Sequence, residues 1–295
     1  MHKTRYNALR LKLRLSPRGP LLIKAGGISA NPSLPDMQFV RTFHPEKGEV
    51  LYIPGSSLKG VVRGFVEKVL CTVNEENSWR RACPTFPTEQ ESCAKRLGNE
   101  DNSARIYARS CGACRTFGHT RLKGRVAFTD FMPVGEIKTE IRYGVAISRL
   151  SHAVGAGPFE MEIAVAGTFE GQVVLENFEL WQVGLLTLAF ESMNMGLVKV
   201  GFGKNRGFGE VRVEVAEAIL DEVTLNFAAS TWRGLGAFVD DAERQRYRLY
   251  PPYQVEDLPD PERVELIGFY TRRVYRADTW QLAVRHVMEQ TLVPA

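Results

Sequence analysis

The sequence predicts an α+β fold in which helices cover a sheet. Two observations support this class. Stretches with the two-residue alternation of half-buried strands are interleaved with stretches of helical period. The 295-residue chain is 44% hydrophobic, which is enough to bury a full core. No run approaches the ~20 apolar residues of a membrane span, and five cysteines without an export signal favour the reducing cytoplasm.

The elements follow one another in the order strand, helix, strand, strand, helix, strand. Four leucines alternate with basic residues at 9–15, as in a half-buried strand. Apolar residues recur at helical spacing from Leu58 to Leu70, with Ser56 or Ser57 as the expected N-cap. The remaining elements are expected as strands at 50–53, 124–128, 159–169 and 172–180, a helix at 182–195, and a closing hairpin of 198–202 and 211–215. This order is that of an RRM-like or ferredoxin-like core.

Long insertions and an extension decorate this core. We expect a core domain at residues 1–216, with a cysteine-bearing insertion at about 71–118 that has no clear period. Residues 217–295 form a C-terminal extension with a final helix at 278–292. Its aromatic and basic side chains suit either RNA stacking or a subunit interface. They are Trp232, Tyr247, Tyr250, Tyr253, Arg244, Arg246 and Arg248.

Charge is distributed unevenly along the chain. Residues 1–125 carry 22 Lys and Arg against 10 Asp and Glu, whereas residues 126–295 carry 16 against 24. A basic half joined to an acidic half indicates a surface that faces a polyanion. A solvated charged face gives the same composition, so charge alone leaves both alternatives open.

Two glycine-rich segments are candidates for contacting phosphate. Residues 53–60 (IPGSSLKG) form a tight turn that opens a helix, where unpaired amides and Lys59 can bind phosphate. Residues 201–209 (GFGKNRGFG) contain four glycines, which allow close backbone approach, and the cations Lys204 and Arg206. The Gly-x4-Gly-Lys pattern of NTP-binding loops is absent. Either segment by itself is equally consistent with an ordinary turn.

Four of the five cysteines lie in the polar insertion. They are Cys83, Cys93, Cys111 and Cys114. Four thiolates make a closed tetrahedral zinc site, which can fold a segment that has little core of its own. A redox CxxC motif and free thiols are the alternatives. His119 is close enough to replace one ligand, and Cys71 is interpreted as a buried small residue.

Four motifs, in this order, resemble those of the RAMP superfamily. They are PGSSLKG at 54–60, CxxCRxFG at 111–118, RVAFTD at 125–130 and GFGKxRGFG at 201–209. Within that superfamily the pattern, which spans residues 8 to 215, is similar to the repeated backbone subunit of type III CRISPR effectors. The resemblance implies an RRM-like core that polymerises along a CRISPR guide RNA in an antiviral ribonucleoprotein complex. Its partners would be the guide, a target RNA, and other effector subunits, including copies or paralogues of itself.

The resemblance also assigns candidate residues. Contacts with the guide backbone are expected from Ser57, Lys59, Arg63, Gly203, Lys204 and Arg206. A thumb hairpin is expected at about 145–160, where Arg149 and His152 can reach RNA. The ligands of a structural zinc knuckle fall on Cys83, Cys93, Cys111 and Cys114.

The catalytic aspartate of the family falls on Asp36, in the loop after the first strand. Asp36 is the only acidic residue between Met1 and Glu46. It would hold a hydrated Mg²⁺ or Mn²⁺, or take a 2′-hydroxyl proton, at the RNA backbone beside the thumb. A turn-capping aspartate is the alternative, and the segment from here to Pro54 is a few residues longer than in many relatives.

The sequence therefore predicts a guide-RNA-binding subunit that is also an endoribonuclease acting on complementary RNA. One alternative is a purely structural backbone subunit. A second is a guide-processing endonuclease of the same superfamily, although those enzymes usually use a histidine and no histidine lies beside the glycine-rich turns here. A third is a zinc-ribbon protein unrelated to CRISPR.

Overall fold

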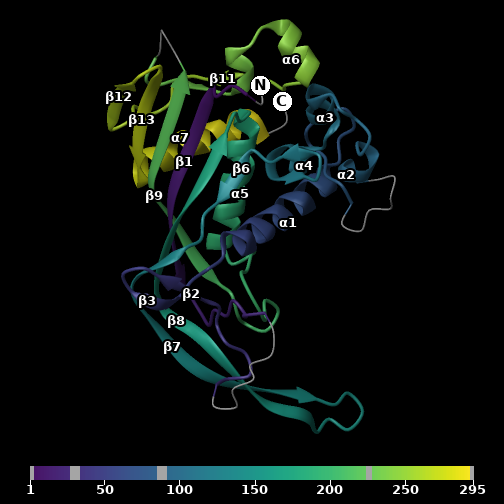
Figure 1. Ribbon diagram of the computed structural model, residues 1–295, viewed down its shortest axis with the longest axis vertical. Coiled ribbons are helices and arrows are strands. Elements are labelled where there is room, and N and C mark those ends of the chain that lie inside the picture. The colour runs from purple at the N-terminus through teal and green to yellow at the C-terminus, as the bar shows by residue number, and fades with distance from the viewer. Residues whose placement is uncertain (1–2, 27–33, 85–91, 224–227, 293–295) are drawn as a thin grey trace.

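A seven-stranded antiparallel sheet forms the centre of the computed structural model, which describes residues 3–26, 34–84, 92–223 and 228–292 (Figure 1). Its strands are β1 (Asn7–Pro17), β6 (Val126–Phe128), β7 (Met132–Ile147), β8 (Val154–Glu176), β9 (Val211–Val223), β12 (Arg263–Ile267) and β13 (Tyr270–Arg276). Their order is β12-β13-β9-β1-β8-β6, with β7 paired to β8. The described part of the chain thus has a sheet with a long hairpin at one end.

Four of these strands and two helices form a ferredoxin-like core. The helix α1 (Gly55–Val73) lies between β1 and β6 in the chain, and α5 (Leu180–Asn194) lies between β8 and β9. In space the four strands run β9-β1-β8-β6, which places the first strand between the fourth and the third. The predicted α+β class with a βαββαβ core is confirmed.

The two core helices differ in how much of their surface is covered. In α1 the buried side chains recur every four residues, at Leu58, Val62, Val66 and Leu70, so only one face packs on the core. In α5 nearly every turn is buried, because the helix packs against the sheet, α1 and the final helix α7 (Ala277–Leu292). The outer face of α1 therefore remains available for a ligand.

The hairpin of β7 and β8 projects from the body of the molecule (Figure 1). The expectation of two strands at 159–169 and 172–180 is wrong, because β8 is continuous, and β7 was not predicted. Two glycines inside β8, Gly167 and Gly171, make room for neighbouring side chains. A Cβ at Gly167 would lie 2.6 Å from the Ile137 side chain, and one at Gly171 would lie 2.5 Å from the Phe131 ring.

Two further predictions, the strand at 50–53 and the closing hairpin, also differ from the structure. The strand expected at 50–53 is β3 (Gly48–Leu51), which pairs with β2 (Arg41–His44) outside the central sheet. The closing hairpin is wrong, because residues 198–202 form no strand and only β9 completes the core. The amides of Val200 and Phe202 bond two different segments, at Gly209 and Leu22, so they form no ladder.

The C-terminal extension continues the same sheet. Here β13 pairs with β9, which itself runs through position 216, and α7 packs on α5 and β9. The Arg273 guanidinium pairs with the Glu222 carboxylate, and both side chains are fully buried. The Trp232 and Trp280 rings stack at 5.4 Å. The extension is therefore joined to the core by a shared ladder and shared packing.

The remaining short elements lie in or just after the insertion and in the C-terminal extension. They are α2 (Cys93–Arg96), α3 (Ser103–Arg109), α4 (Gly112–Phe117), β4 (Gly118–His119), β5 (Leu122–Lys123), β10 (Trp232–Arg233), a 3-10 turn (Leu235–Phe238), α6 (Asp241–Tyr247) and β11 (Gln254–Val255). The Trp79 ring, just after α1, stacks on Trp181 of α5 at 4.6 Å. No helix in the described residues is long and apolar enough to span a membrane.

Candidate RNA-binding groove and metal centre

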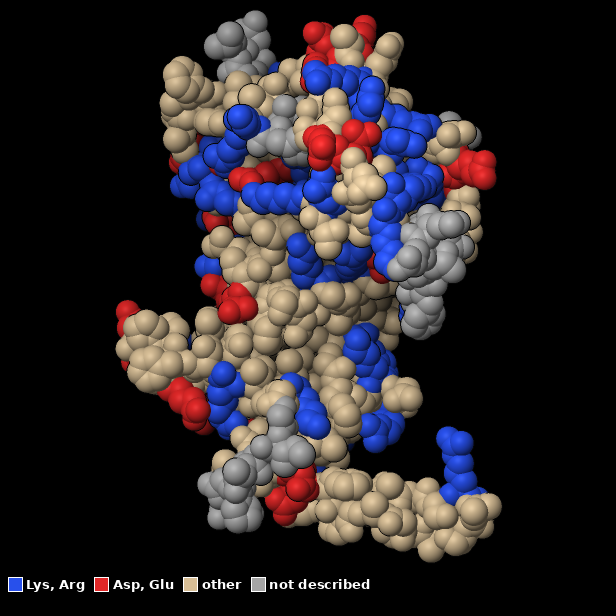
Figure 2. Space-filling model, turned by 45° about the vertical axis from the view of Figure 1, so that its right-hand side comes forward, with Lys and Arg blue, Asp and Glu red and all other residues tan. Residues whose placement is uncertain are grey.

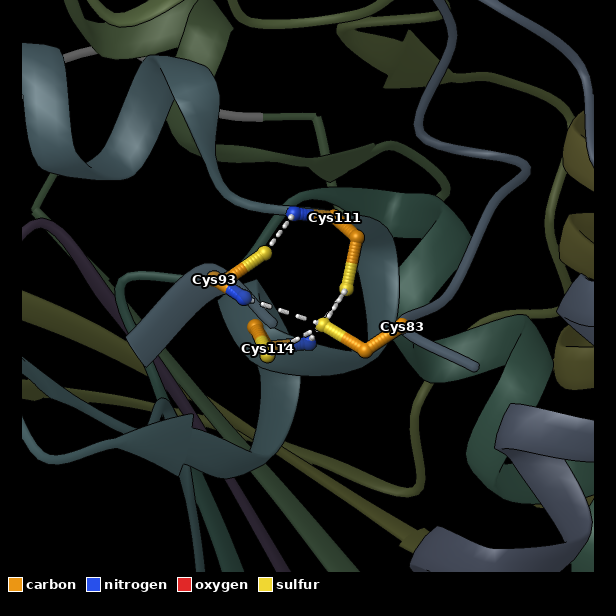
Figure 3. A group of neighbouring side chains, drawn as sticks. All are labelled: Cys83, Cys93, Cys111 and Cys114. Atoms are coloured by element: carbon orange, nitrogen blue, oxygen red, sulfur yellow. Dashed lines mark hydrogen bonds between the residues drawn. The ribbon is translucent and has the colours of Figure 1, made fainter. Parts of the chain in front are cut away.

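Four cysteines of the insertion point toward one another (Figure 3). Cys83 lies in the loop after α1, Cys93 opens α2, and Cys111 and Cys114 lie before and within α4. All four Sγ atoms lie within 4.8 Å of one another, and Cys83 Sγ lies 3.7 Å from that of Cys111 and 3.8 Å from that of Cys114. A tetrahedral zinc with Zn–S bonds of ~2.3 Å requires sulfurs ~3.8 Å apart. The cluster has the geometry of a zinc site.

Backbone amides hold the sulfurs in place. The amides of Cys93, Cys111 and Cys114 donate to Cys83 Sγ, Cys93 Sγ and Cys111 Sγ at 3.3, 3.3 and 3.5 Å. Hydrogen bonding with Cys111 and Cys114 lowers the pKa of Cys93, whereas hydrogen bonding with Cys111 raises the pKa of Cys114. Four thiolates this close repel one another unless a cation lies among them. The buried cluster can hold a metal ion, and its soft donors suit zinc.

The alternative ligand His119 and the fifth cysteine, Cys71, lie outside the cluster. His119 Nε2 lies 3.0 Å from Ser110 Oγ, and its Nδ1 accepts from the Arg121 amide, so its ring is oriented by other partners. Cys71 is half-buried rather than buried, and its Sγ donates to the carbonyl of Cys83 at 3.5 Å. The four cysteines named from the sequence are the set that the fold brings together.

The glycine-rich loop at 201–209 folds back on the N-terminal segment. Gly201 and Gly209 have φ of +82° and +86°, and a Cβ at either would lie within 2.3 Å of a backbone carbonyl oxygen. The Gly203 carbonyl accepts from the Arg206 amide at 2.8 Å, which closes a turn. Lys204 and Arg206 are exposed on this turn, and the Arg206 guanidinium lies 4.9 Å from the Phe202 ring centroid. Tight packing of the glycines thus presents two cations to solvent.

A groove with a cavity volume of about 430 Å³ lies between α1 and this loop. Its lining consists of Gly60, Val61, Gly64, Phe65, Lys68, Leu197, Val198, Lys199, Lys204 and Asn205. Gly60 and Gly64 are one helical turn apart, and a Cβ at either would meet open space. Lys68 lies one turn further along the same face, and no acidic side chain lines the groove among the described residues. Gly60 and Gly64, which we call the glycine floor, leave space for a ligand backbone because they have no side chains. Lysines line the groove beside them, which suits a polyanion.

None of the α1 residues assigned from the sequence is among those that line this groove, and their surroundings differ. Lys59 is half-buried, and burial followed by the charge of Arg63 lowers its pKa. Arg63 donates to Glu67 Oε1 at 2.7 Å and to the Gly118 carbonyl at 3.0 Å, so its guanidinium ties α1 to the insertion. Ser57 is half-buried in the first turn. The fold therefore places neither Lys59 nor Arg63 in the lining of the groove.

The N-terminus of α1 differs from expectation. The helix begins at Gly55, and neither Ser56 nor Ser57 is its N-cap. The Gly55 amide donates to Asp130 Oδ1 at 2.8 Å, so the protein supplies its own anion at this helix end. A Cβ at Gly55 would lie 2.5 Å from two backbone carbonyl oxygens just after β6. Phosphate contacts are thus favoured along the side of α1 instead of at its first amide.

Asp36 is exposed and lies against the base of the projecting hairpin. Its Oδ2 accepts from the Glu160 amide of β8 at 2.9 Å, and the Met37 amide donates to the Glu160 carbonyl at 2.9 Å. This is the contact of a residue that fixes a loop to a strand, as the non-catalytic alternative expects. Residues 27–33, just before it, lie outside the described residues.

Arg149 and His152 lie at the tip of the hairpin, in the turn between β7 and β8 (Figure 1). Both are exposed, and His152 adopts a φ of +55°. The fold therefore places them at the far end of the hairpin instead of beside the groove. Every second side chain of β7 near this tip is apolar and exposed. They are Ile141, Tyr143, Val145 and Ile147.

Sequence reasoning missed part of the groove. Gly60, Gly64 and Lys68 recur every four residues, a spacing that places them on one helical face and was visible in the sequence. Lys199, which pairs with Glu210 at 2.9 Å, had no such signal, because its place depends on the loop packing.

The fold and sites define a ferredoxin-like protein with a basic groove and a metal-competent cysteine cluster. The model of the RAMP superfamily matches residues 14–212, more than half of the chain. The chain belongs to the RAMP superfamily. Membership indicates a CRISPR-associated RNA-binding function, with CRISPR RNA and other effector subunits as partners. A search among curated proteins found no match.

Proposed function

We propose that this chain binds CRISPR guide RNA as a repeated backbone subunit of a type III effector. The observation that carries the proposal is the groove between α1 and the glycine-rich loop, in a member of the RAMP superfamily. Its glycine floor admits a sugar–phosphate backbone, and Lys68 and Lys204 would neutralise phosphates. Such contacts position RNA without reading its sequence, which leaves recognition of the target to base pairing.

The cysteine cluster would hold a structural zinc in this subunit. The helices of the insertion are four, seven and six residues long, too short to be stable alone. A closed four-sulfur site leaves no open position for substrate, so its contribution is folding energy. The metal would hold the insertion against α1 and thereby shape one end of the RNA path.

We further propose that Asp36 takes part in cleavage of the complementary RNA. Support comes from its exposure and from its place at the base of the hairpin, where the guide and target would be distorted. Mg²⁺ or Mn²⁺ bound there would compensate charge at a phosphodiester, since such ions typically use one or two carboxylates plus phosphate oxygens. The carboxylate is oriented by the Glu160 amide. A non-catalytic scaffold remains the second candidate, because that same contact gives Asp36 a structural role.

The guide-binding proposal is tested by the RNA that copurifies from the native cell. Sequencing should yield RNAs of differing spacer sequence that share one repeat-derived tag. The effector subunits should copurify with them. A random sample of cellular RNA without a common tag would overturn the assignment.

The cleavage proposal is tested with Asp36→Asn. The amide oxygen of asparagine can still accept from the Glu160 amide, so the loop contact is retained while the charge is removed. Guide loading and target affinity should stay at the wild-type level, while cleavage of complementary RNA by the assembled complex falls by at least ~10²-fold. Cleavage at the wild-type rate would make Asp36 structural and favour the scaffold.

A further inference from the structure

A second basic surface lies where α3 of the insertion meets α6 of the extension, at the opposite end of α1 from the glycine-rich loop (Figure 1). It surrounds a cavity of about 640 Å³. The lining consists of Ala108, Arg109, Asp241, Arg244, Gln245, Arg248, Leu249 and Tyr253. One wall belongs to α6 and the residues after it, which lie beyond the residues matched by the family model. We call this the α3–α6 surface.

Arginines of both walls carry the positive charge of the α3–α6 surface: Arg109 of α3 on one side, and Arg244 and Arg248 of the extension on the other. Residues 92–123 carry seven Lys and Arg against two Asp and Glu. Arg105 and Arg109 of α3 are exposed, and neither forms an ion pair within the described residues. The cavity's carboxylate, Asp241, already pairs with Arg244 at 2.7 Å. Figure 2 shows Lys and Arg gathered over this upper part of the molecule.

The two walls of the cavity are fixed to each other. The buried Arg115 guanidinium donates to the Ala108 carbonyl at 2.8 Å and to the Arg248 carbonyl at 2.9 Å, one on each wall. The Arg244 guanidinium lies 4.6 Å from the Tyr253 ring centroid. An arginine guanidinium and a tyrosine ring are both groups on which an unpaired nucleobase can stack. The surface is thus preformed, cationic and suited to an unpaired base.

The α3–α6 surface also lies on a path that leads from the groove. The groove follows α1 through Gly60 and Lys68 toward its C-terminal end at Val73, about 20 Å of helix at ~1.5 Å per residue. Just beyond that end, the Asn77 carbonyl accepts from Arg248 Nη2 at 2.7 Å. A strand that leaves the groove along α1 therefore arrives at Arg248.

We infer that the α3–α6 surface binds a single-stranded stretch of the same RNA strand that occupies the α1 groove. The inference rests on the proposed function and adds a second contact region to it. RNA is favoured over an acidic protein because unpaired arginines, a stacking plane and continuity with the groove occur together.

The test compares Arg105→Ala/Arg109→Ala with wild type on oligouridine of two lengths, about 6 and about 30 nucleotides, the shorter covering only one site. Affinity for the long RNA should fall about 3- to 10-fold, and the slope of log K against log salt should become shallower by about 1.4, for two lost phosphates. Affinity for the short RNA should not change. The matched control is Arg212→Ala/Arg285→Ala, which removes two exposed arginines beside a different cavity, between α5, β9 and α7. Its binding should equal that of wild type at both lengths.

Photocrosslinking with 4-thiouridine RNA gives an independent readout. Crosslinks to peptides that carry Tyr253 or Arg109 support the inference. Unchanged affinity of the Arg105→Ala/Arg109→Ala protein for the long RNA would overturn it and leave the surface to an acidic protein or to none. If wild type binds neither RNA, the proposed function itself fails, so the two failures are distinguishable.

Discussion

Replacing Cys114 with serine tests whether the cysteine cluster holds a structural zinc. Cys114 is 2% exposed, and its sulfur lies 3.8 Å from that of Cys83. Structural zinc contributes about 10–16 kcal/mol of binding energy in small domains. Since the serine removes one of four ligands, the insertion should lose about a quarter of this, ~2.5–4 kcal/mol, which weakens zinc binding by about 10²–10³-fold. That loss is large compared with the stability of a typical domain.

The assay combines elemental analysis with unfolding. Wild type should contain about one zinc per chain, and Cys114→Ser should release its zinc to a chelator that leaves wild type loaded. Hydrogen exchange should rise in residues 92–117 far more than in β1 or β8, because the core packs without the metal. Cys71→Ser is the matched control: this cysteine lies outside the cluster, so zinc content should be unchanged. A Cys114→Ser protein with wild-type zinc and stability would refute the reasoning, as would a metal-free, stable wild type.

Three further predictions concern the packing around these sites. Arg115→Met should lower the free energy of unfolding in urea by about 3 kcal/mol, because three backbone carbonyls lose a buried charged donor. An unchanged midpoint would contradict this prediction. Gly201→Ala should lower the thermal stability more than Gly207→Ala, since both glycines have a positive φ but only the first substitution would place a Cβ 2.3 Å from a carbonyl oxygen. Equal shifts in melting temperature would show that only the backbone strain at positive φ matters. Burial tends to raise the pKa of Asp221, but hydrogen bonds and charge from Arg272 and two other arginines outweigh it and lower that pKa. Its stabilisation is therefore present at neutral pH and lost as pH falls below about 4, so Asp221→Asn should be less stable by ~1–3 kcal/mol at pH 7 and equal to wild type in strong acid.

The parts of the fold that could be predicted were those where one face alone is buried. The alternation at 9–15 identified β1, and the four-residue spacing from Leu58 to Leu70 identified α1, because burial on one side leaves a period in the sequence. The hairpin strand β7 escaped prediction. Its outer half has an apolar side chain at every second residue from Ile141 to Ile147, but both faces are exposed there, so this alternation does not mark a buried face.

Local patterns misled where tertiary packing decides the structure. Val198, Val200 and Phe202 alternate like a strand, but their backbone groups bond separate segments. Ser56 and Ser57 suit an N-cap, yet Asp130, far along the chain, accepts from the first amide of α1. This hydrogen bond joins segments that are far apart in the sequence, so no local pattern predicts it.

The candidate site likewise contains residues that a sequence pattern predicts and residues whose place depends on tertiary packing. The four cysteines could be assigned because a CxxC pair with two further thiols favours a zinc site over a redox motif or free thiols, and because the family resemblance names the same set, which the fold brings together. The groove could not be assigned in full, because Lys199 joins it through loop packing. Arg63 had the right charge, but its guanidinium bonds Glu67 and the Gly118 carbonyl.

The most direct test of the central claim is the salt dependence of RNA binding by Lys68→Ala/Lys204→Ala. Both lysines line the groove, and neither pairs with a carboxylate among the described residues. Wild type should bind two RNAs of unrelated sequence with equal affinity. The variant should bind both more weakly, with a slope of log K against log salt shallower by about 1.4, for two lost phosphate contacts. A wild-type slope in the variant, or a strong preference of wild type for one RNA sequence, would contradict backbone binding in this groove.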